Sequence, residues 1–521
     1  MKRNMKRYPI WKIVSIIICA ILAIAEIVSG VLLVLADILP NKHLFLLFGI
    51  FVLVDVLIGF LLFLPFKTIR GKKIPLFQII GYVLSLAVLI GSLYISAFVV
   101  KVNQTLSAIT SQPTITAIVD VYVPADSPAK TIDDAKNYTF AVTDSYDWTN
   151  TQKAIAAIEA KLGCKLNTVT YPSVLAMIEA LYSEKADALF LNSAYLSILN
   201  DAGIYTDFGT RTRVLFQFSV EEVVSPKPTT PSESETTGTT STEPSETIPD
   251  KQNEIAPFVI YLSGIDSYAQ YLTTSLSDVN VVAVVNPQTK QILLVNTPRD
   301  YYVANPAGGG AKDKLTHCGI YGINCSMEAL ENLYNEDITY HARINFTGFE
   351  TLVDAIGGVT VYSELAYTTH HGGFPIQVGD NHLNGIQAVC FARERYALTH
   401  GDNDRGQNHM KLITAIINKM STSTLLANYA EILDSLQGMF TTDLPQENIR
   451  QLVKTQLSDS ASWTIHTYAV NGTDAMDETY SMPGMDLCVT YPDQPSIDLA
   501  SQLIDRVMAG EILVPEDLIP Q

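Results

Sequence analysis

The stretch VNVVAVVNPQTKQILLVNTPRDYYV, residues 279–303, joins two apolar segments through a short turn and ends in an arginine–aspartate pair. VNVVAVV and ILLVN are rich in β-branched and leucine side chains and are separated by PQTK, which predicts two neighbouring strands. Arg299 and Asp300 follow the second strand. Because α/β folds place ligands at strand ends, this pair marks a candidate site.

A third apolar strand precedes this stretch and also leads to an acid. PFVIYLSGIDSY, residues 257–268, carries Asp266 at its end, and Asp278 stands directly before VNVVAVV. Two carboxylates at strand ends suit Mg²⁺, which takes one or two carboxylates together with water and phosphate oxygens. Each aspartate taken singly is better explained as a turn residue or a cap.

A pair of arginines lies further along the chain, in FARERY at residues 391–396. Arg393 and Arg395 are two positions apart, so their guanidinium groups share one face only if the segment is extended. Arginine presents a planar fork of donors that matches phosphate oxygens. Surface salt bridges are the simpler explanation for any one arginine, but not for several arginines placed beside two carboxylates.

GDNDRGQNHMKLITAIINKM, residues 401–420, predicts a helix. Asp402 or Asp404 is expected to cap it, and Arg405 and His409 are four positions apart on one face. The positive end of such a helix adds to the attraction for an anion. The expected buried stripe consists of Met410, Ile413, Ile417 and Met420.

The order and spacing of several motifs resemble those of the LytR-CpsA-Psr family over residues 255–420. The motifs are GIDSY, SDVNVVAVVNPQTKQILLVNTPRDYYV, KLTHCGIYG, INFTGFETLVDAIGGVTVY, LNGIQAVCFARERY and GDNDRGQN. The resemblance implies an α/β fold, an αβα sandwich with a mixed central sheet, anchored outside the cell membrane. It also implies transfer of a glycopolymer from a polyprenyl-pyrophosphate carrier to peptidoglycan, with teichoic acid, capsule and other glycans open as the polymer.

The resemblance also implies roles for individual residues. Asp266 and Asp278 would hold Mg²⁺ on the pyrophosphate, and the pyrophosphate oxygens would be gripped by Arg299, Arg393, Arg395 and Arg405. Asp300 and Asp402 are candidates for substrate contact or general base, by their closeness in sequence to these arginines.

His409 departs from the family pattern, which commonly has glutamine at this position. Histidine can donate to a phosphate oxygen and commonly titrates near neutral pH. We therefore expect His409 to bind substrate, and a coupling of activity to pH is a hypothesis.

Three apolar runs, residues 13–36, 44–64 and 76–100, are each long enough to cross a bilayer as a helix. Basic residues precede the first run and fill the loop between the second and third, whereas the first loop has only Lys42. The positive-inside rule then places the amino terminus in the cytoplasm and everything after Val100 outside. Two acids, Glu26 and Asp55, lie within the runs; the simplest reading is that they hold the helices together.

The part expected outside the membrane is strongly acidic. Residues 1–101 contain 11 of the 34 basic and 3 of the 53 acidic residues, so 23 basic and 50 acidic residues remain, a formal charge of −27. This sign opposes binding to nucleic acid. Five of the six cysteines lie in this part, and Cys318 and Cys325 are close enough in sequence to form a disulfide.

The chain divides into four predicted parts. A membrane anchor with three helices occupies residues 1–101, a small α/β module residues 118–224, and a Ser/Thr/Pro/Glu-rich disordered linker residues 225–254. The catalytic domain follows at residues 255–521. In the module, Asn150 is expected to cap a helix, and IEALYSEKADALFLNSAYLSIL, residues 178–199, resembles one lobe of extracellular solute-binding proteins. A single lobe provides no ligand cleft, which favours a structural or protein-contacting module.

Two other functions fit the same residues. A pyrophosphatase acting on the same lipid carrier would admit water in place of a sugar hydroxyl. A nonenzymatic envelope sensor or scaffold would use the module and merely bind lipid with the second domain. AGGGAKDK, residues 307–314, lacks the P-loop pattern and is expected to be a mobile loop beside the site.

Overall fold

The computed structural model of this chain describes residues 10–65, 67–69, 72–110, 114–144, 146–223, 255–399, 401–422, 432, 434–459 and 461–519. The expected linker at residues 225–254 lies outside them. The chain forms two compact units, each described by itself below. The helical unit comprises Met1–Ala108, Leu426–Asp434 and Pro445–Ala461, and the α/β unit comprises Ile109–Leu425, Ser435–Leu444 and Ser462–Gln521.

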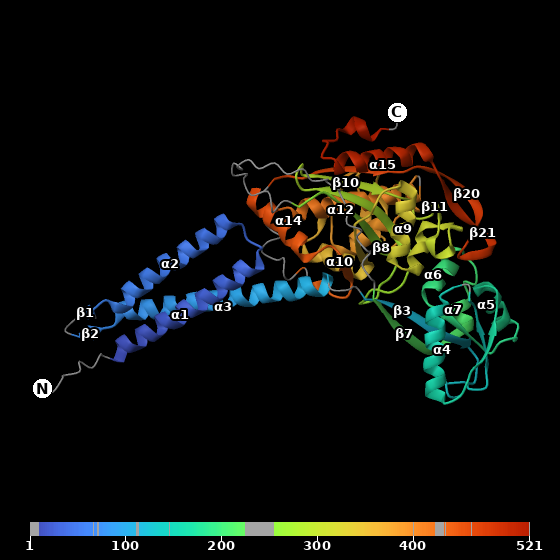
Figure 1. Ribbon diagram of the computed structural model, residues 1–521, viewed down its shortest axis with the longest axis horizontal. Coiled ribbons are helices and arrows are strands. Elements are labelled where there is room, and N and C mark those ends of the chain that lie inside the picture. Colours follow the sequence, from blue (N-terminus) through green and yellow to red (C-terminus); the bar gives the residue numbers. More distant parts are fainter. Residues whose placement is uncertain are drawn as a thin grey trace, which may run out of the picture. The chain divides into compact units, whose positions relative to one another are not determined.

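The helical unit is built on three long apolar helices, α1 (Ile10–Ala36), α2 (Asn41–Phe63) and α3 (Leu76–Thr110), shown in blue in Figure 1. All three are long and apolar enough to cross a membrane, as expected from the sequence. A short ladder, β1 (Lys67–Ile69) with β2 (Lys72–Ile74), connects α2 to α3. Glu26 of α1 and Asp55 of α2 line one groove of about 500 Å³.

Helix α14 (Gln446–Asp459) belongs to this helical unit. Lys454 pairs with Asp37 at 2.6 Å, and Arg450 donates to the side chain of Asn103 at 3.0 Å. This helix is therefore part of the helical unit and not of the α/β unit.

A mixed six-stranded sheet forms the centre of the α/β unit. Its order is β18 (Phe440–Thr442), β13 (Tyr340–Asn345), β8 (Phe258–Ile265), β9 (Ser277–Asn286), β10 (Gln291–Asn296) and β19 (Thr464–Ala469). Strands β8, β9 and β10 pair antiparallel, whereas β13 is parallel to β8 and β19 is parallel to β10. The ends of β8 and β10 therefore meet the start of β9 at one edge of the sheet.

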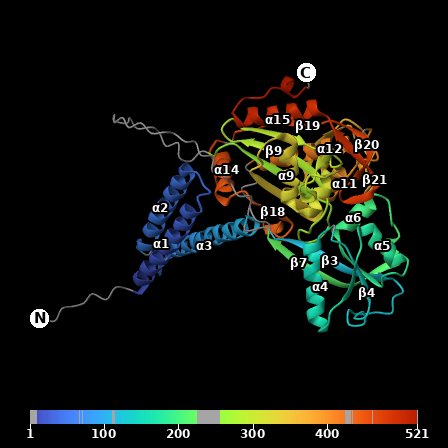
Figure 2. The same cartoon turned by 45° about the vertical axis from the view of Figure 1, so that its right-hand side comes forward.

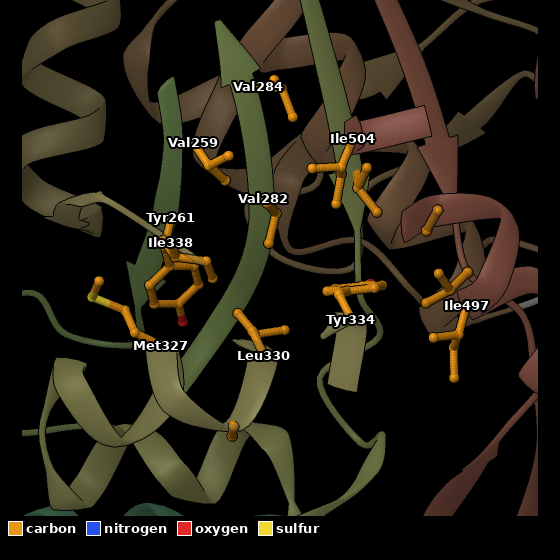
Figure 3. Close-up of a cluster of buried hydrophobic side chains, with 14 of the residues drawn as sticks. Val259, Tyr261, Val282, Val284, Met327, Leu330, Tyr334, Ile338, Ile497 and Ile504 are labelled. Atoms are coloured by element: carbon orange, nitrogen blue, oxygen red, sulfur yellow. The ribbon is translucent and has the colours of Figure 1, made fainter. Parts of the chain in front are cut away.

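Helices cover both faces of this sheet. On one face, α9 (Ile323–Tyr334) and α15 (Gln494–Met508) pack against the inward side chains of β8, β9 and β10; Figure 3 shows Leu330 and Tyr334 of α9 directed toward the strands. On the other face, α12 (Asp402–Met420) lies against β10 and β19 and shares a core with α10 (Phe346–Ala355) and α11 (Gly385–Ala392). The αβα sandwich with a mixed sheet is confirmed.

Smaller elements surround the sandwich. They are β11 (Tyr302–Ala304) paired with β12 (Lys312–Lys314), α8 (Leu315–Cys318), β14 (Val359–Ser363) paired with β17 (Gly379–Leu383), β15 (Tyr367–Thr368) paired with β16 (Pro375–Ile376), and β20 (Gly472–Thr479) paired with β21 (Met482–Pro492); short 3₁₀ turns occupy Pro306–Gly308, Gly319–Tyr321 and Pro515–Leu518. Residues 307–314, expected to form a loop beside the site, include the turn and the second strand of the β11–β12 hairpin. All six cysteines are free, so Cys318 and Cys325 are not bridged.

The amino-terminal module, residues 114–223, has its own five-stranded sheet. The strand order is β5 (Asn167–Thr170), β4 (Thr139–Val142), β6 (Ala188–Asn192), β3 (Thr114–Pro124) and β7 (Thr212–Val223), and the helices are α4 (Trp148–Leu162), α5 (Val174–Tyr182), α6 (Ala194–Asp201) and α7 (Phe208–Arg211). Asp147 is the residue before α4, so Asn150 lies inside the helix and is not its cap.

Candidate active site

The candidate site lies at the sheet edge where β8 and β10 end and β9 begins. Ile265 pairs with Ser277, which brings Asp266, just after β8, beside Asp278 at the start of β9. Asn296 pairs with Val281 in the antiparallel β9–β10 ladder, so continuing the same register brings Arg299 opposite Asp278. The strand topology thus joins three residues that the sequence separates.

Arg299 is the centre of this group. Its side chain is 4% exposed, and its Nη1 lies 2.7 Å from Oδ1 of Asp278. Thr316 also donates to Asp278, at 3.3 Å. Burial lowers the pKa of Arg299, whereas the nearby carboxylate of Asp300 raises it. Because the guanidinium group is withdrawn from water, its interactions with charged neighbours are stronger than on the surface.

Asp300 is held by two cations. Its Oδ1 lies 3.1 Å from Nζ of Lys314 and 3.6 Å from Nε of Arg299. Burial raises the pKa of Asp300, but Arg299 and Lys314 outweigh it, and the pKa is lowered. A carboxylate stabilised in this way is a weak base. Lys314 was not among the expected site residues, although its segment was expected to lie beside the site.

Arg405, in the first turns of α12, interacts with the same charged residues. It contacts Asp402, and it influences both Asp278 and Arg299 electrostatically. Gly401 precedes the helix without a side-chain cap, so the expected capping by Asp402 or Asp404 is wrong. The buried stripe of α12 also differs from the expected one: the fully buried apolar residues are Met410, Leu412 and Ile416, whereas Ile413, Ile417 and Met420 are only partly buried.

Gly406 allows α12 to approach the sheet this closely. A Cβ atom at this position would lie 2.4 Å from the side-chain nitrogen of Asn296, the last residue of β10. Asn296 is itself buried. Because Gly406 has no side chain, the first turns of α12, which include Arg405, lie close to the end of β10.

Arg393 and Arg395 have different partners. Arg395 donates to Tyr396 at 2.8 Å and interacts electrostatically with Asp402 and Asp300. Arg393 donates to the hydroxyl of Tyr268 at 2.9 Å, and its guanidinium carbon lies 4.9 Å from the ring centre of Phe346. The segment leaves α11 in a turn and is not extended. The structure therefore groups Arg395 with Arg299 and Arg405, and places Arg393 beside the loop after β8.

Glu394, between the two arginines, organises this turn. Its fully buried carboxylate accepts the backbone N–H groups of Arg395, Tyr396 and Ala397 at 2.8–3.0 Å, and that of His370. Burial raises the pKa of Glu394, but these four hydrogen bonds outweigh it and the pKa is lowered. No sequence signal distinguished Glu394 from an ordinary surface glutamate.

His409 is buried, whereas it was expected to bind substrate. Its Nε2 lies 2.8 Å from the carbonyl oxygen of Ala392, inside the protein. Burial, with the positive charge of Arg405, lowers the pKa of His409 to about 3. A histidine with so low a pKa stays neutral near pH 7, which opposes a coupling of activity to pH in that range.

The acids of the site suit a cation held jointly with a substrate. Burial, together with the nearby carboxylates of Asp266 and Asp402, raises the pKa of Asp278 to about 7, and Arg405 offsets part of this rise. Within the described residues, no group of three or more His, Cys, Asp or Glu side chains could hold a metal by itself. Asp266 and Asp278 thus fit Mg²⁺ that completes its shell with phosphate oxygens and water, and do not fit a cage made of protein alone.

Together, the fold and site define a protein with three potential membrane helices and an α/β domain whose arginines and carboxylates are arranged for a phosphate-containing ligand. Residues 225–487 match the LytR_cpsA_psr family, and the chain belongs to that family.

Curated relatives are similar to part of the chain. The polyisoprenyl-teichoic acid–peptidoglycan teichoic acid transferase TagU of Enterococcus faecalis is 34% identical over 38% of this chain and 66% of its own length, just under two thirds. The TagU protein of Oceanobacillus iheyensis is 32% identical over 39% of this chain and 67% of its own length. The crystal structure of B. subtilis TagV aligns with a TM-score of 0.42 at 22% identity, over 50% of this chain and 99% of TagV.

Proposed function

We propose that this protein transfers a glycopolymer, of the teichoic acid class, from a polyprenyl-pyrophosphate carrier to peptidoglycan. The observation that carries the proposal is the mixed charge cluster at the sheet edge. Four cations, Arg299, Lys314, Arg395 and Arg405, interact there with the carboxylates of Asp278, Asp300 and Asp402. The names of the TagU relatives support teichoic acid as the polymer class and peptidoglycan as the acceptor.

In the proposed reaction, an acceptor hydroxyl of peptidoglycan attacks the phosphorus nearest the sugar. A new P–O bond forms, the pyrophosphate bridge breaks, polyprenyl phosphate leaves with the electron pair, and the proton of the acceptor hydroxyl is released to water. Arg299 and Arg405 bind the phosphate oxygens and neutralise the charge that develops on the leaving group. Asp278 and Asp402 orient these two arginines through their ion pairs.

Magnesium is part of the proposal. When bound, it would neutralise pyrophosphate charge and favour departure of polyprenyl phosphate. Asp266 and Asp278 are the residues that would hold it. Asp300 is proposed to keep Arg299 and Lys314 in place, and its lowered pKa disfavours it as the base.

The α/β unit is proposed to lie on the outer side of the cell membrane, where peptidoglycan is found. The distribution of basic residues around α1, α2 and α3 supports this orientation. Cys164 and Cys488 are exposed and free, which provides a direct test. In intact cells, a membrane-impermeant maleimide should label the wild-type chain and fail to label Cys164→Ser/Cys488→Ser. Labelling only after cell lysis would place the α/β unit in the cytoplasm.

The activity is tested with the purified full chain in detergent, a pyrophosphate-linked polyprenyl glycan, a peptidoglycan oligomer and Mg²⁺. A phosphodiester-linked product that disappears in Arg299→Ala would establish transfer. Release of polyprenyl phosphate and free sugar phosphate, without a peptidoglycan-linked product, would instead show a pyrophosphatase. Binding of the lipid without turnover would favour a sensor or scaffold.

A further inference from the structure

The amino-terminal module reaches the candidate active site through helix α6. Asp201, the last residue of α6, contacts Nη2 of Arg299, while Asp278 holds Nη1 of the same guanidinium group. Asp201 thus pairs with the most deeply placed arginine of the site, although it lies across the linker from it in sequence. No pattern in the sequence indicated this contact.

The helix that carries Asp201 is fixed to the catalytic domain at its other end. Tyr195, which is 1% exposed, donates through its hydroxyl to the backbone oxygen of Ser481, and its ring centre lies 5.0 Å from that of Tyr146. Tyr146 in turn contacts Tyr321 of the catalytic domain, with ring centres 5.7 Å apart. In both Figure 1 and Figure 2, α6 lies beside the β20–β21 hairpin.

The two parts also share a hydrophobic core and a backbone connection. Leu276, Ile320 and Met482 of the catalytic domain belong to the same buried cluster as the apolar side chains of α5 and α6. Thr116 of β3 exchanges two backbone hydrogen bonds of 3.1 Å with the loop between Asp266 and Asp278, at Leu272 and Thr274. The module is therefore packed against the catalytic domain beside the site and is not a separate lobe.

An acidic residue at the carboxyl end of a helix is stabilised by a positively charged partner. The carboxyl end of a helix carries partial negative charge, which disfavours Asp201 at this position. The guanidinium group of Arg299 supplies the opposite charge. The contact between the two residues thus accounts for an acid that the local structure of α6 does not favour.

Arg299 keeps donors for a ligand despite these two carboxylates. A guanidinium group has five N–H donors in one plane, and Asp278 and Asp201 each approach a different terminal nitrogen. Its Nε is buried and faces Asp300 at 3.6 Å, whereas each terminal nitrogen has a second N–H group. Two partners at the two terminal nitrogens fix the plane of the group and leave other donors available.

We propose that Asp201 is a positioning residue for the transfer reaction: the module supplies its carboxylate to hold the Arg299 guanidinium in the orientation that binds the pyrophosphate. This inference rests on the proposed function. It gives the module a role in the chemistry, beyond a structural or protein-contacting one. The alternative, in which Asp201 competes with phosphate for Arg299, requires α6 to move away from a shared core.

The test compares Asp201→Asn, Asp201→Glu and Asp133→Asn in the full-length protein. Asp133→Asn is the matched control, because it removes the same charge from an exposed position of the same module. We expect Asp201→Asn to lower kcat/KM for transfer by about 10- to 100-fold, since a misplaced catalytic group has effects of this size. Asp201→Glu should recover part of the loss, and Asp133→Asn should match wild type.

Binding of inorganic pyrophosphate with Mg²⁺, measured by calorimetry, provides a readout that does not need turnover. Asp201→Asn should weaken this binding about tenfold while its Tm stays within about 2 °C of wild type. Binding or transfer equal to wild type would overturn the proposal, and tighter binding would show competition instead. If Asp201→Asn loses activity together with a large fall in Tm, and Asp201→Glu does not recover activity, then Asp201 contributes to packing and not to positioning.

Arg299→Ala separates this inference from the proposed function. If Arg299→Ala transfers glycan and binds pyrophosphate as wild type does, the site itself has been misassigned, whatever Asp201→Asn does. If Arg299→Ala is inactive and Asp201→Asn is normal, the proposed function stands and the positioning role of Asp201 fails.

Discussion

Nη1 of Arg299 lies 2.7 Å from Oδ1 of Asp278, although 21 positions separate the two residues in the chain. The antiparallel pairing of β9 with β10 creates this contact, because the residue that starts β9 faces the residues that follow β10. The pair is almost fully withdrawn from water, with side-chain exposures of 4% and 13%. A ligand that binds Arg299 therefore meets a guanidinium group already oriented by a carboxylate.

Replacing Arg299 by lysine should abolish most of the transfer activity. Lysine keeps the charge but lacks the planar fork that holds Asp278 while donating to a phosphate oxygen. We expect kcat/KM to fall by about 100- to 1,000-fold, the usual cost of losing a donor to developing negative charge. Arg506→Lys, in a partly exposed ion pair of α15, is the control and should transfer normally. Substantial activity in Arg299→Lys would show that charge alone suffices.

Removal of magnesium should stop transfer, and Asp278→Asn should raise the magnesium requirement. A chelator is expected to abolish turnover, and added Mg²⁺ to restore it. Because an amide oxygen is a weaker ligand than a carboxylate, Asp278→Asn should need about tenfold more Mg²⁺ for half-maximal rate. Asp486→Asn, an exposed position on β21, should show the wild-type requirement. Full activity in chelator would remove magnesium from the mechanism.

Gly406→Ala should damage both stability and transfer. The added Cβ would lie 2.4 Å from the buried side-chain nitrogen of Asn296, so α12 or β10 must shift. Overpacking of this kind costs about 1–3 kcal/mol, against a gain in helix propensity of about 1 kcal/mol. Thermal unfolding and the transfer rate measure the two effects. Gly209→Ala in α7, where nothing lies within 4 Å of the new Cβ, is the control; equal results for both variants would contradict the close approach.

Glu394→Gln should destabilise the turn that carries Arg395. A buried carboxylate that accepts four backbone N–H groups is replaced by an uncharged amide, which we expect to cost about 2 kcal/mol. Because the folded-state pKa of Glu394 is lowered, its contribution is present above the unfolded pKa of about 4.3 and is lost as pH falls. The deficit in unfolding free energy relative to wild type should therefore be largest at neutral pH. An equal deficit in Glu516→Gln, at an exposed position, would refute the role of the turn.

His409→Gln should leave the pH profile of transfer unchanged between about pH 5.5 and 8, a range around the usual histidine pKa of about 6.5. The stability profile should change. The folded-state pKa of about 3 lies below the unfolded value, so unfolding takes up a proton and wild type loses stability as pH falls below about 6.5. The variant should lose less stability over that range in chemical denaturation. A pH profile of transfer that differs between the two proteins would restore the original hypothesis.

Local sequence patterns predict the main elements of the fold and most of the site. The long apolar runs predict α1, α2 and α3, because a helix that crosses a bilayer needs about 20 consecutive apolar residues. The alternation of apolar strands and helices predicts the sandwich. Arg299, Asp278 and Arg405 can be recognised from the sequence because each lies in a short motif. The neighbouring residues of each motif indicate a strand end or a helix start. Family membership follows from the same motifs.

The partners of these residues depend on how distant segments of the chain pack together. Lys314 reaches Asp300 through a hairpin, Glu394 organises a turn from a buried position, and His409 is neutral because it is enclosed. Asp201 meets Arg299 across the linker through a shared core. Burial and long-range contact set pKa values and orientations, and both depend on atoms brought together by packing, which sequence spacing does not encode.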